Sequence, residues 1–199
     1  MTWKFKDLRE YIAFLESKGV LRRITTTVST DLEITEITDR MVKSGGPALL
    51  FENVEGHSMP LLINAFGTIQ RSAWALGVEN LDELTSRVRE LLGMVKEPHQ
   101  GLMAKFKALG QLAHIASFQP KTVKNAPCQE VVITGADVDL SKLPVLTCWP
   151  DDAGPFITLP LVVSRDPVTG VRNIGIYRMQ VYDRNTTGMH WQTHKVGAH

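Results

Sequence analysis

One stretch of this sequence combines an apolar, strand-like run with side chains that can bind an ion or a ligand. The run VRNIGIYRMQVYD, residues 171–183, carries Asn173 and Arg178, and His194 follows in GMHWQTHKVGAH. A guanidinium among apolar residues costs free energy to desolvate unless a carboxylate or an anionic ligand faces it. By residue type alone, Arg178 is therefore either a structural ion-pair residue or an anchor for an anionic substrate.

Asn173 and His194 offer an amide oxygen and an imidazole nitrogen. Together with a carboxylate and a phosphate oxygen, such donors suit Mn²⁺ or Mg²⁺. Two donors do not complete a site, and a single histidine near a strand end is also typical of a protein surface. Both interpretations stay open at the level of residue types.

The spacing of Asn173 and Arg178 sets a condition on their cooperation. Side chains alternate along a regular strand, so these two would point to opposite faces. A bulge at Gly175 would change this parity, because a glycine within a strand often marks a bulge or a close ligand approach. The two side chains would then lie roughly 15 Å apart. That span suits a long ligand such as a flavin nucleotide.

The first part of the chain reads as mixed helix and strand. Apolar residues at helical spacing, ended by glycine, predict helices over residues 8–18 and 32–42 and in 84–95, with a further stripe from Leu102 onward. β-branched and apolar runs predict strands within residues 20–29, 48–54 and 60–66. These alternations indicate an α/β domain.

From residue 119 onward the pattern changes to β. Strands are predicted at 130–135, 156–166, 171–183 and 189–192, separated by segments rich in Gly, Pro, Asn and Asp. Pro160 lies within one of these runs and indicates an edge or a bulge, since proline cannot donate to a ladder. A barrel or sandwich begins here.

Composition excludes several classes of function. The 199 residues include 43% hydrophobic and 22% charged residues with a formal net charge of +1, which argues against a nucleic-acid partner. The two cysteines, Cys128 and Cys148, are too far apart for a CxxC motif. No run of about 18 apolar residues is present. We predict a cytoplasmic protein whose composition is compatible with peripheral membrane contact.

Four segments carry a resemblance to a known family. In chain order they are DLEITEITDRMVKSGGPALLFENVEG, TCWPDDAGPFIT, NIGIYRMQVYD and GMHWQTHKVGAH. Together they resemble the UbiD-type decarboxylases, and within that family the 4-hydroxy-3-polyprenylbenzoate decarboxylases. The similarity extends over essentially the whole chain.

The resemblance implies an architecture and a reaction. It implies an α/β (α+β) protein with an N-terminal α/β domain over residues 1–118. Residues 119–199 would form the first part of a flavin-reductase-like split β-barrel that binds prenylated FMN. The implied reaction is the non-oxidative decarboxylation of 4-hydroxy-3-polyprenylbenzoate in ubiquinone biosynthesis, with Mn²⁺ or alternatively Mg²⁺. Homo-oligomers, specifically hexamers, and peripheral contact with the inner face of the cell membrane are implied as well.

The same resemblance implies roles for individual residues. Asn173 and His194 would be metal ligands, with a glutamate beyond His199 as the third. Arg178 would be the catalytic arginine between two acids that also follow residue 199. The implied cofactor-binding residues are Thr158, Ile176, Tyr177, Arg178, His190, Trp191, Gln192, Lys195 and Val196. For His190 and Gln192, side-chain roles and a mere place in the pocket wall are both open.

Because HKVGAH follows directly after a strand, we expect the barrel to continue in a longer protein and the 199-residue chain alone to be inactive.

Two other functions remain as alternatives. A flavin reductase or oxidase on the same barrel is one alternative, although no dinucleotide-binding fingerprint supports it. A non-catalytic subunit or assembly fragment is the other.

Overall fold

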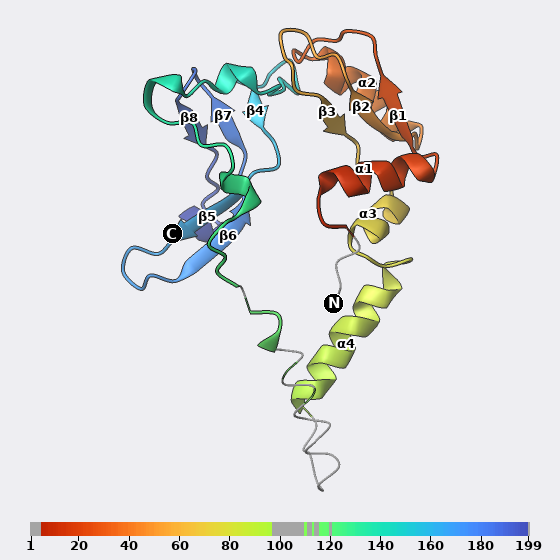
Figure 1. Cartoon of the computed structure of the whole chain (residues 1–199), viewed down its shortest axis with the longest axis vertical. Helices are drawn as coiled ribbons and strands as arrows, with labels where there is room; N and C mark the ends of the chain where they lie inside the picture. Colours follow the sequence, from red (N-terminus) through yellow and green to blue (C-terminus); the bar gives the residue numbers. More distant parts are fainter. Residues whose placement is uncertain (1–4, 97–109, 111–112, 114–115, 120, 199) are drawn as a thin grey trace, which may run out of the picture. The chain divides into compact units, whose positions relative to one another are not determined.

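The computed structural model describes residues 5–96, 110, 113, 116–119 and 121–198 (Figure 1). Helices and short sheets make up these residues, which confirms the α/β class. The chain divides into two compact units, one comprising Ile69–Ile133 with Met1–Phe5 and the other comprising Lys6–Thr68 and Thr134–His199. The predicted apolar stripe that starts at Leu102 falls mainly on residues outside the described part.

The larger unit begins with a helix, strand and helix followed by two strands. These are α1 Leu8–Ser17, β1 Leu21–Ile24, α2 Glu33–Lys43, β2 Ala48–Phe51 and β3 Leu61–Ile63. Strand β2 lies in the middle of the sheet, parallel to β1 and antiparallel to β3. All four residues of β2 are buried, as its unbroken apolar sequence ALLF predicts.

The core of this unit also holds a segment from later in the chain. Leu146 packs in one cluster with Val28, Ile34, Leu49, Phe51 and Val54, and Cys148 packs against that cluster. The Leu32 amide donates to the Thr147 carbonyl at 3.1 Å, and the Thr147 amide donates to the Thr30 carbonyl at 3.1 Å. The chain that leads to the second group of strands is thereby anchored in the N-terminal core.

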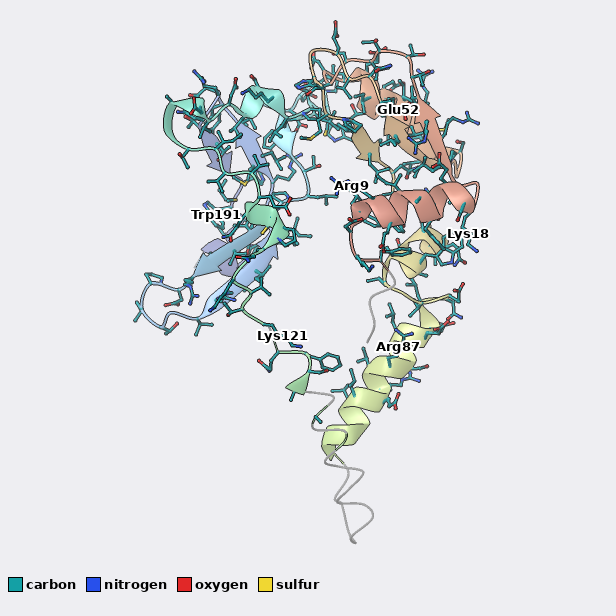
Figure 2. The ribbon with its side chains drawn as sticks, viewed as in Figure 1. Arg9, Lys18, Glu52, Arg87, Lys121 and Trp191 are labelled. Carbon is teal, nitrogen blue, oxygen red and sulfur yellow. The ribbon has the colours of Figure 1, made fainter. Side chains whose placement is uncertain are left out.

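A surface ion-pair network joins α1 to the sheet. Arg23 on β1 donates to Glu16 at 2.6 Å and to Glu52, labelled in Figure 2, at 2.6 Å. The hydrogen bond from Arg23 lowers the pKa of the Glu16 carboxyl. All three residues are solvated, so this network is sensitive to pH and salt.

The smaller unit contains α3, Ile69–Ala75, and α4, Asp82–Lys96. Helix α4 confirms the helix predicted within residues 84–95, whereas α3 was not predicted. Within the described residues, none of the helices combines the length and apolar character that crossing a membrane requires.

The second group of strands forms two small sheets. Its strands are β4 Phe156–Ile157, β5 Leu161–Arg165, β6 Arg172–Ile176, β7 Met179–Val181 and β8 Thr187–Met189. Strands β4, β7 and β8 form an antiparallel sheet in the order β4-β7-β8, and β5 pairs with β6 in a separate two-stranded sheet. No closed barrel is formed by the described residues.

Four strand predictions need correction. The strand predicted at 189–192 shares only Met189 with the observed strand β8, Thr187–Met189. Residues 130–135 form no strand, and Val131 and Val132 are 77% and 72% exposed, because no described strand pairs with them. The predicted strand over 156–166 is split into β4 and β5 around Pro160, which lacks the amide that a continuous ladder needs. The predicted strand over 171–183 is split into β6 and β7 because the chain passes from one sheet to the other at Tyr177 and Arg178.

Candidate functional site

The position of the break between β6 and β7 decides how the site is built. The β5-β6 ladder runs without interruption from Arg165 opposite Arg172 to Leu161 opposite Ile176, with Gly175 in register opposite Val162. The bulge that would have changed the strand parity at Gly175 is therefore absent. The glycine serves packing instead, since a Cβ atom at this position would lie 2.5 Å from the Tyr177 ring.

Tyr177 is the buried centre of this region, with 6% of its surface exposed. Its hydroxyl accepts a hydrogen bond from the Gly197 amide at 2.8 Å and a longer one from the Asn173 side-chain amide at 3.5 Å. Its ring lies 5.0 Å from the Trp191 ring, centroid to centroid. Tyr177 thus connects β6 to the short 3₁₀ helix η4, Val196–Ala198.

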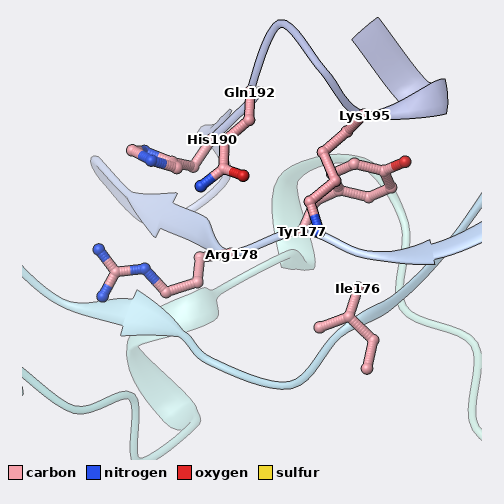
Figure 3. Close-up of a pocket in the computed structure, with 6 residues that line it drawn as sticks. All are labelled: Ile176, Tyr177, Arg178, His190, Gln192 and Lys195. Carbon is pink, nitrogen blue, oxygen red and sulfur yellow. The ribbon is translucent and has the colours of Figure 1, made fainter.

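Two cavities lie next to this tyrosine. The arginine cavity, of about 330 Å³, is lined by Ile176, Tyr177, Arg178, His190, Gln192 and Lys195 (Figure 3). The asparagine cavity, of about 720 Å³, has Asn173, Trp191 and Val196 among its lining residues, together with Arg165 and Arg172. The structure therefore brings six predicted cofactor-binding residues together in one cavity and two more, with Asn173, in the other.

Arg178 has a carboxylate partner within the described chain, namely Asp152. The Arg178 Nη2 atom lies 3.5 Å from Asp152 Oδ1, and the guanidinium carbon lies 4.3 Å from the centre of the Phe156 ring. Phe156 pairs with Gln180 across β4 and β7, and Arg178 is two residues before Gln180, so both side chains occupy one face of the sheet. Sequence reasoning missed Asp152, although it lies in the WPDDAGP segment used for the family resemblance.

His190 occupies the position opposite Arg178. The register of β7 and β8 ends at Met179 opposite Met189, and the His190 amide continues it by donating to the Arg178 carbonyl at 2.9 Å. Residues directly opposite in an antiparallel pair share a face. Figure 3 shows the imidazole and the guanidinium extending in the same direction.

The electrostatics reach back to the core through Cys148. Burial raises the pKa of its thiol, the Asp152 carboxylate raises it further, and the Arg178 guanidinium lowers it. Cys148 packs against the core cluster that contains Leu146. The thiol is therefore a natural reporter of the arrangement of Asp152 and Arg178.

Two predicted site residues lie apart from this arrangement. His194 is exposed and is not among the residues that line these cavities. Thr158 lies in a third, largely apolar cavity of about 650 Å³, in the company of Leu61, Phe66 and Leu146.

The fit to a metal ion is partial. The side-chain N–H of Asn173 donates a hydrogen bond to the Tyr177 hydroxyl. The side-chain oxygen of Asn173 is left as a ligand of the kind that Mn²⁺ and Mg²⁺ bind. In the described part of the chain, no three or more His, Cys, Asp or Glu side chains come together in a way that could hold a metal. A complete coordination shell would require donors from outside these residues.

Comparison with known proteins defines the class. Residues 12–91 match the family model described as the 3-octaprenyl-4-hydroxybenzoate carboxy-lyase N-terminal domain, and residues 121–199 match the model of the Rift-related domain of the same carboxy-lyase. Members of the family that both models describe are carboxy-lyases. The chain belongs to the UbiD family, which confirms the resemblance found in the sequence at the level of the family.

Individual relatives agree with this assignment. An uncharacterized protein of Archaeoglobus fulgidus is 50% identical over 194 residues, which are 98% of this chain and 39% of that protein. An evolved dimeric form of the UbiD-class enzyme HmfF from Pelotomaculum thermopropionicum, in complex with prFMN, is 31% identical with a TM-score of 0.69 over 93% of this chain and 38% of that one. The apo 3,4-dihydroxybenzoic acid decarboxylase of Enterobacter cloacae is 27% identical with a TM-score of 0.73 over 98% and 38% of the two chains. The chain thus spans about two fifths of the length of these relatives.

Proposed function

We propose that this chain contributes the N-terminal domain and part of the flavin site of a UbiD-type decarboxylase that removes CO₂ from an aromatic acid. The observation that carries the proposal is the arginine cavity, because six residues predicted from the sequence to bind the cofactor line it. One of them, Arg178, is a cation suited to a carboxylate substrate. HmfF is a relative of the same family, and its complex with prFMN supports a flavin as the cofactor.

The proposed reaction breaks the bond between the ring carbon and the carboxyl carbon. The electron pair stays with the ring carbon, CO₂ leaves, and a proton replaces it. When bound, prFMN supplies an electrophilic ring that accepts this electron density. Arg178 binds and orients the carboxylate before cleavage, and Tyr177 with Trp191 forms the wall beside the cofactor.

We propose that Asn173 and His194 hold a divalent metal, Mn²⁺ or Mg²⁺, at the phosphate end of the flavin. The amide oxygen of Asn173 that its bond to Tyr177 leaves available supports this role. The third metal ligand and the proton-donating acid are proposed to come from residues outside this chain. Thr158 and Val196 complete the proposed set of cofactor contacts, and the boundary between the two domains is proposed at residues 118 and 119.

The substrate is proposed to be 4-hydroxy-3-polyprenylbenzoate, in the context of ubiquinone biosynthesis. The description of both matching family models as parts of a 3-octaprenyl-4-hydroxybenzoate carboxy-lyase supports this choice. Relatives that act on smaller acids, such as 3,4-dihydroxybenzoic acid, make a tail-free aromatic acid the competing substrate. A homo-oligomer, specifically a hexamer, and peripheral contact with a membrane are part of the same proposal.

The experiment compares the 199-residue chain with the same chain extended by any residues that follow it in its gene. Both are loaded with prFMN and Mn²⁺, given 4-hydroxy-3-prenylbenzoate or 3,4-dihydroxybenzoate, and assayed for CO₂. We expect release by the extended chain alone and a loss of at least about 100-fold in the Arg178→Ala variant. Full activity of that variant would contradict the role of the arginine, and activity of the short chain would contradict the need for further residues. Flavin bleaching by a nicotinamide donor would instead indicate a reductase.

A further inference from the structure

Two adjacent aspartates in the segment that leads to β4 differ in environment. Asp151 is exposed, whereas only 13% of the Asp152 side chain is exposed. Its Oδ2 atom is buried and accepts no hydrogen bond from any described residue, while Oδ1 faces Arg178. A carboxylate that is buried in this way destabilises a protein unless a cation compensates it. The position of the Asp152 carboxylate therefore depends on Arg178, and the position of the Arg178 guanidinium depends on Asp152 in turn.

The guanidinium of Arg178 is held on two sides. The Phe156 ring covers one face at 4.3 Å, and Asp152 lies beside one edge at 3.5 Å. Its side chain keeps 35% exposure and lines the arginine cavity, which Asp152 does not line. Within the described residues, the guanidinium donates no hydrogen bond, so its N–H groups are available to a ligand in that cavity.

The backbone around Asp152 is itself fixed. The Asp152 amide donates to the Trp149 carbonyl at 3.0 Å, and Gln180 on β7 donates its side-chain N–H to the Ala153 carbonyl at 2.7 Å. Because Gln180 is two residues after Arg178, the carboxylate and the guanidinium are tied to the same strand. This connection restrains the separation between the two side chains.

We infer that Asp152 is a positioning residue that, with the Phe156 ring, holds the Arg178 guanidinium so that its uncommitted N–H donors face a carboxylate in the arginine cavity. The inference deepens the proposed function and rests on it for the aromatic acid as ligand. Asp152 touches neither substrate nor cofactor in this role. It acts by restricting the rotamers of a long side chain that would otherwise lose entropy on binding.

The test is carried out on the 199-residue chain with 3,4-dihydroxybenzoate as the probe and 3,4-dihydroxybenzamide as its uncharged analogue. Binding is followed by ligand-observed NMR and calorimetry for the wild type, Asp152→Asn and Asp151→Asn. We expect Asp152→Asn to weaken binding of the carboxylate by about 10- to 100-fold and to leave binding of the amide unchanged. The matched control Asp151→Asn removes the same charge from an exposed position and is expected to change neither affinity by more than about two-fold.

A second readout is independent of any ligand. In a Cys128→Ser background, the thiol of Cys148 is titrated by its rate of alkylation against pH. Asp152→Asn is expected to lower the pKa of this thiol, because it removes the carboxylate that raises it, whereas Asp151→Asn leaves it in place. This readout separates a local rearrangement from loss of the fold.

Several outcomes would overturn the inference. These are a wild-type affinity of Asp152→Asn for the carboxylate, equal losses in both asparagine variants, or no selectivity of the wild type for the acid over the amide. Should Asp152→Asn not fold, the neutral variant Asp152→Ser replaces it, and unchanged carboxylate binding in that variant overturns the inference. If the extended chain releases no CO₂ while Asp152→Asn still weakens carboxylate binding selectively, the proposed function fails and the positioning role stands.

Discussion

Replacing Tyr177 by phenylalanine removes a single oxygen atom from the centre of the site. The ring and its contact with Trp191, 5.0 Å between centroids, are retained. Two hydrogen bonds are lost, one from the Gly197 amide at 2.8 Å and one from Asn173 at 3.5 Å. The substitution therefore tests the hydroxyl with little change in packing volume.

The expected loss of stability follows from these two bonds. A hydrogen bond of ordinary length contributes about 1 kcal/mol net, and the contact at 3.5 Å is at the weak end of the range. We expect the free energy of unfolding to fall by about 1 kcal/mol, which is about a five-fold change in the unfolding equilibrium. The amide of Gly197, deprived of its acceptor, should exchange its hydrogen faster.

Urea denaturation and amide hydrogen exchange measure these effects, with Tyr182→Phe as the matched control. Tyr182 is 63% exposed, so removing its solvated hydroxyl should cost little stability. Because Tyr177 orients the proposed metal ligand Asn173, Mn²⁺ affinity of the flavin-loaded extended chain should also fall by about ten-fold. Equal stability of the two variants, with unchanged protection of Gly197, would refute the role given to the Tyr177 hydroxyl.

Three further predictions concern the rest of the chain. Leu49→Ala, at a core side chain that is 1% exposed, should lower the free energy of unfolding by about 2–5 kcal/mol in urea denaturation, and a much smaller loss would contradict the core assignment. At neutral pH the thiol of Cys148, whose pKa is raised mainly by burial, should react several-fold more slowly with a thiol reagent than that of the exposed Cys128, as peptide mapping can measure. The ion pair with Arg23 lowers the pKa of the Glu16 carboxyl, so the stability that this pair confers is present above the unfolded-state pKa and is lost as pH falls through the folded-state pKa. In thermal denaturation, Arg23→Met should therefore be less stable than the wild type at neutral pH and equally stable at about pH 2.

Local patterns were sufficient to predict α1, α2, α4 and the N-terminal strands, but not the short helix α3. The apolar spacing that predicts α2 also places Ile34 in the core, because a helix of fixed period presents the same face to its neighbours along its length. A strand, by contrast, forms only where another strand supplies its backbone hydrogen-bond partners. Val131 and Val132 have strand-forming side chains but no described partner strand, and the segment is irregular.

The sequence by itself determined the family and the α/β class, since these depend on local periodicity or on motifs read as text. It also predicted Ile176, Tyr177 and Arg178 as site residues, which are adjacent in the chain. Only the tertiary structure decided that β6 and β7 belong to different sheets, which brings His190 opposite Arg178 and directs Asn173 to another cavity. It alone paired Arg178 with Asp152, 26 positions earlier in the chain. Backbone pairing and a turn create that contact, and residue types do not encode a through-space distance.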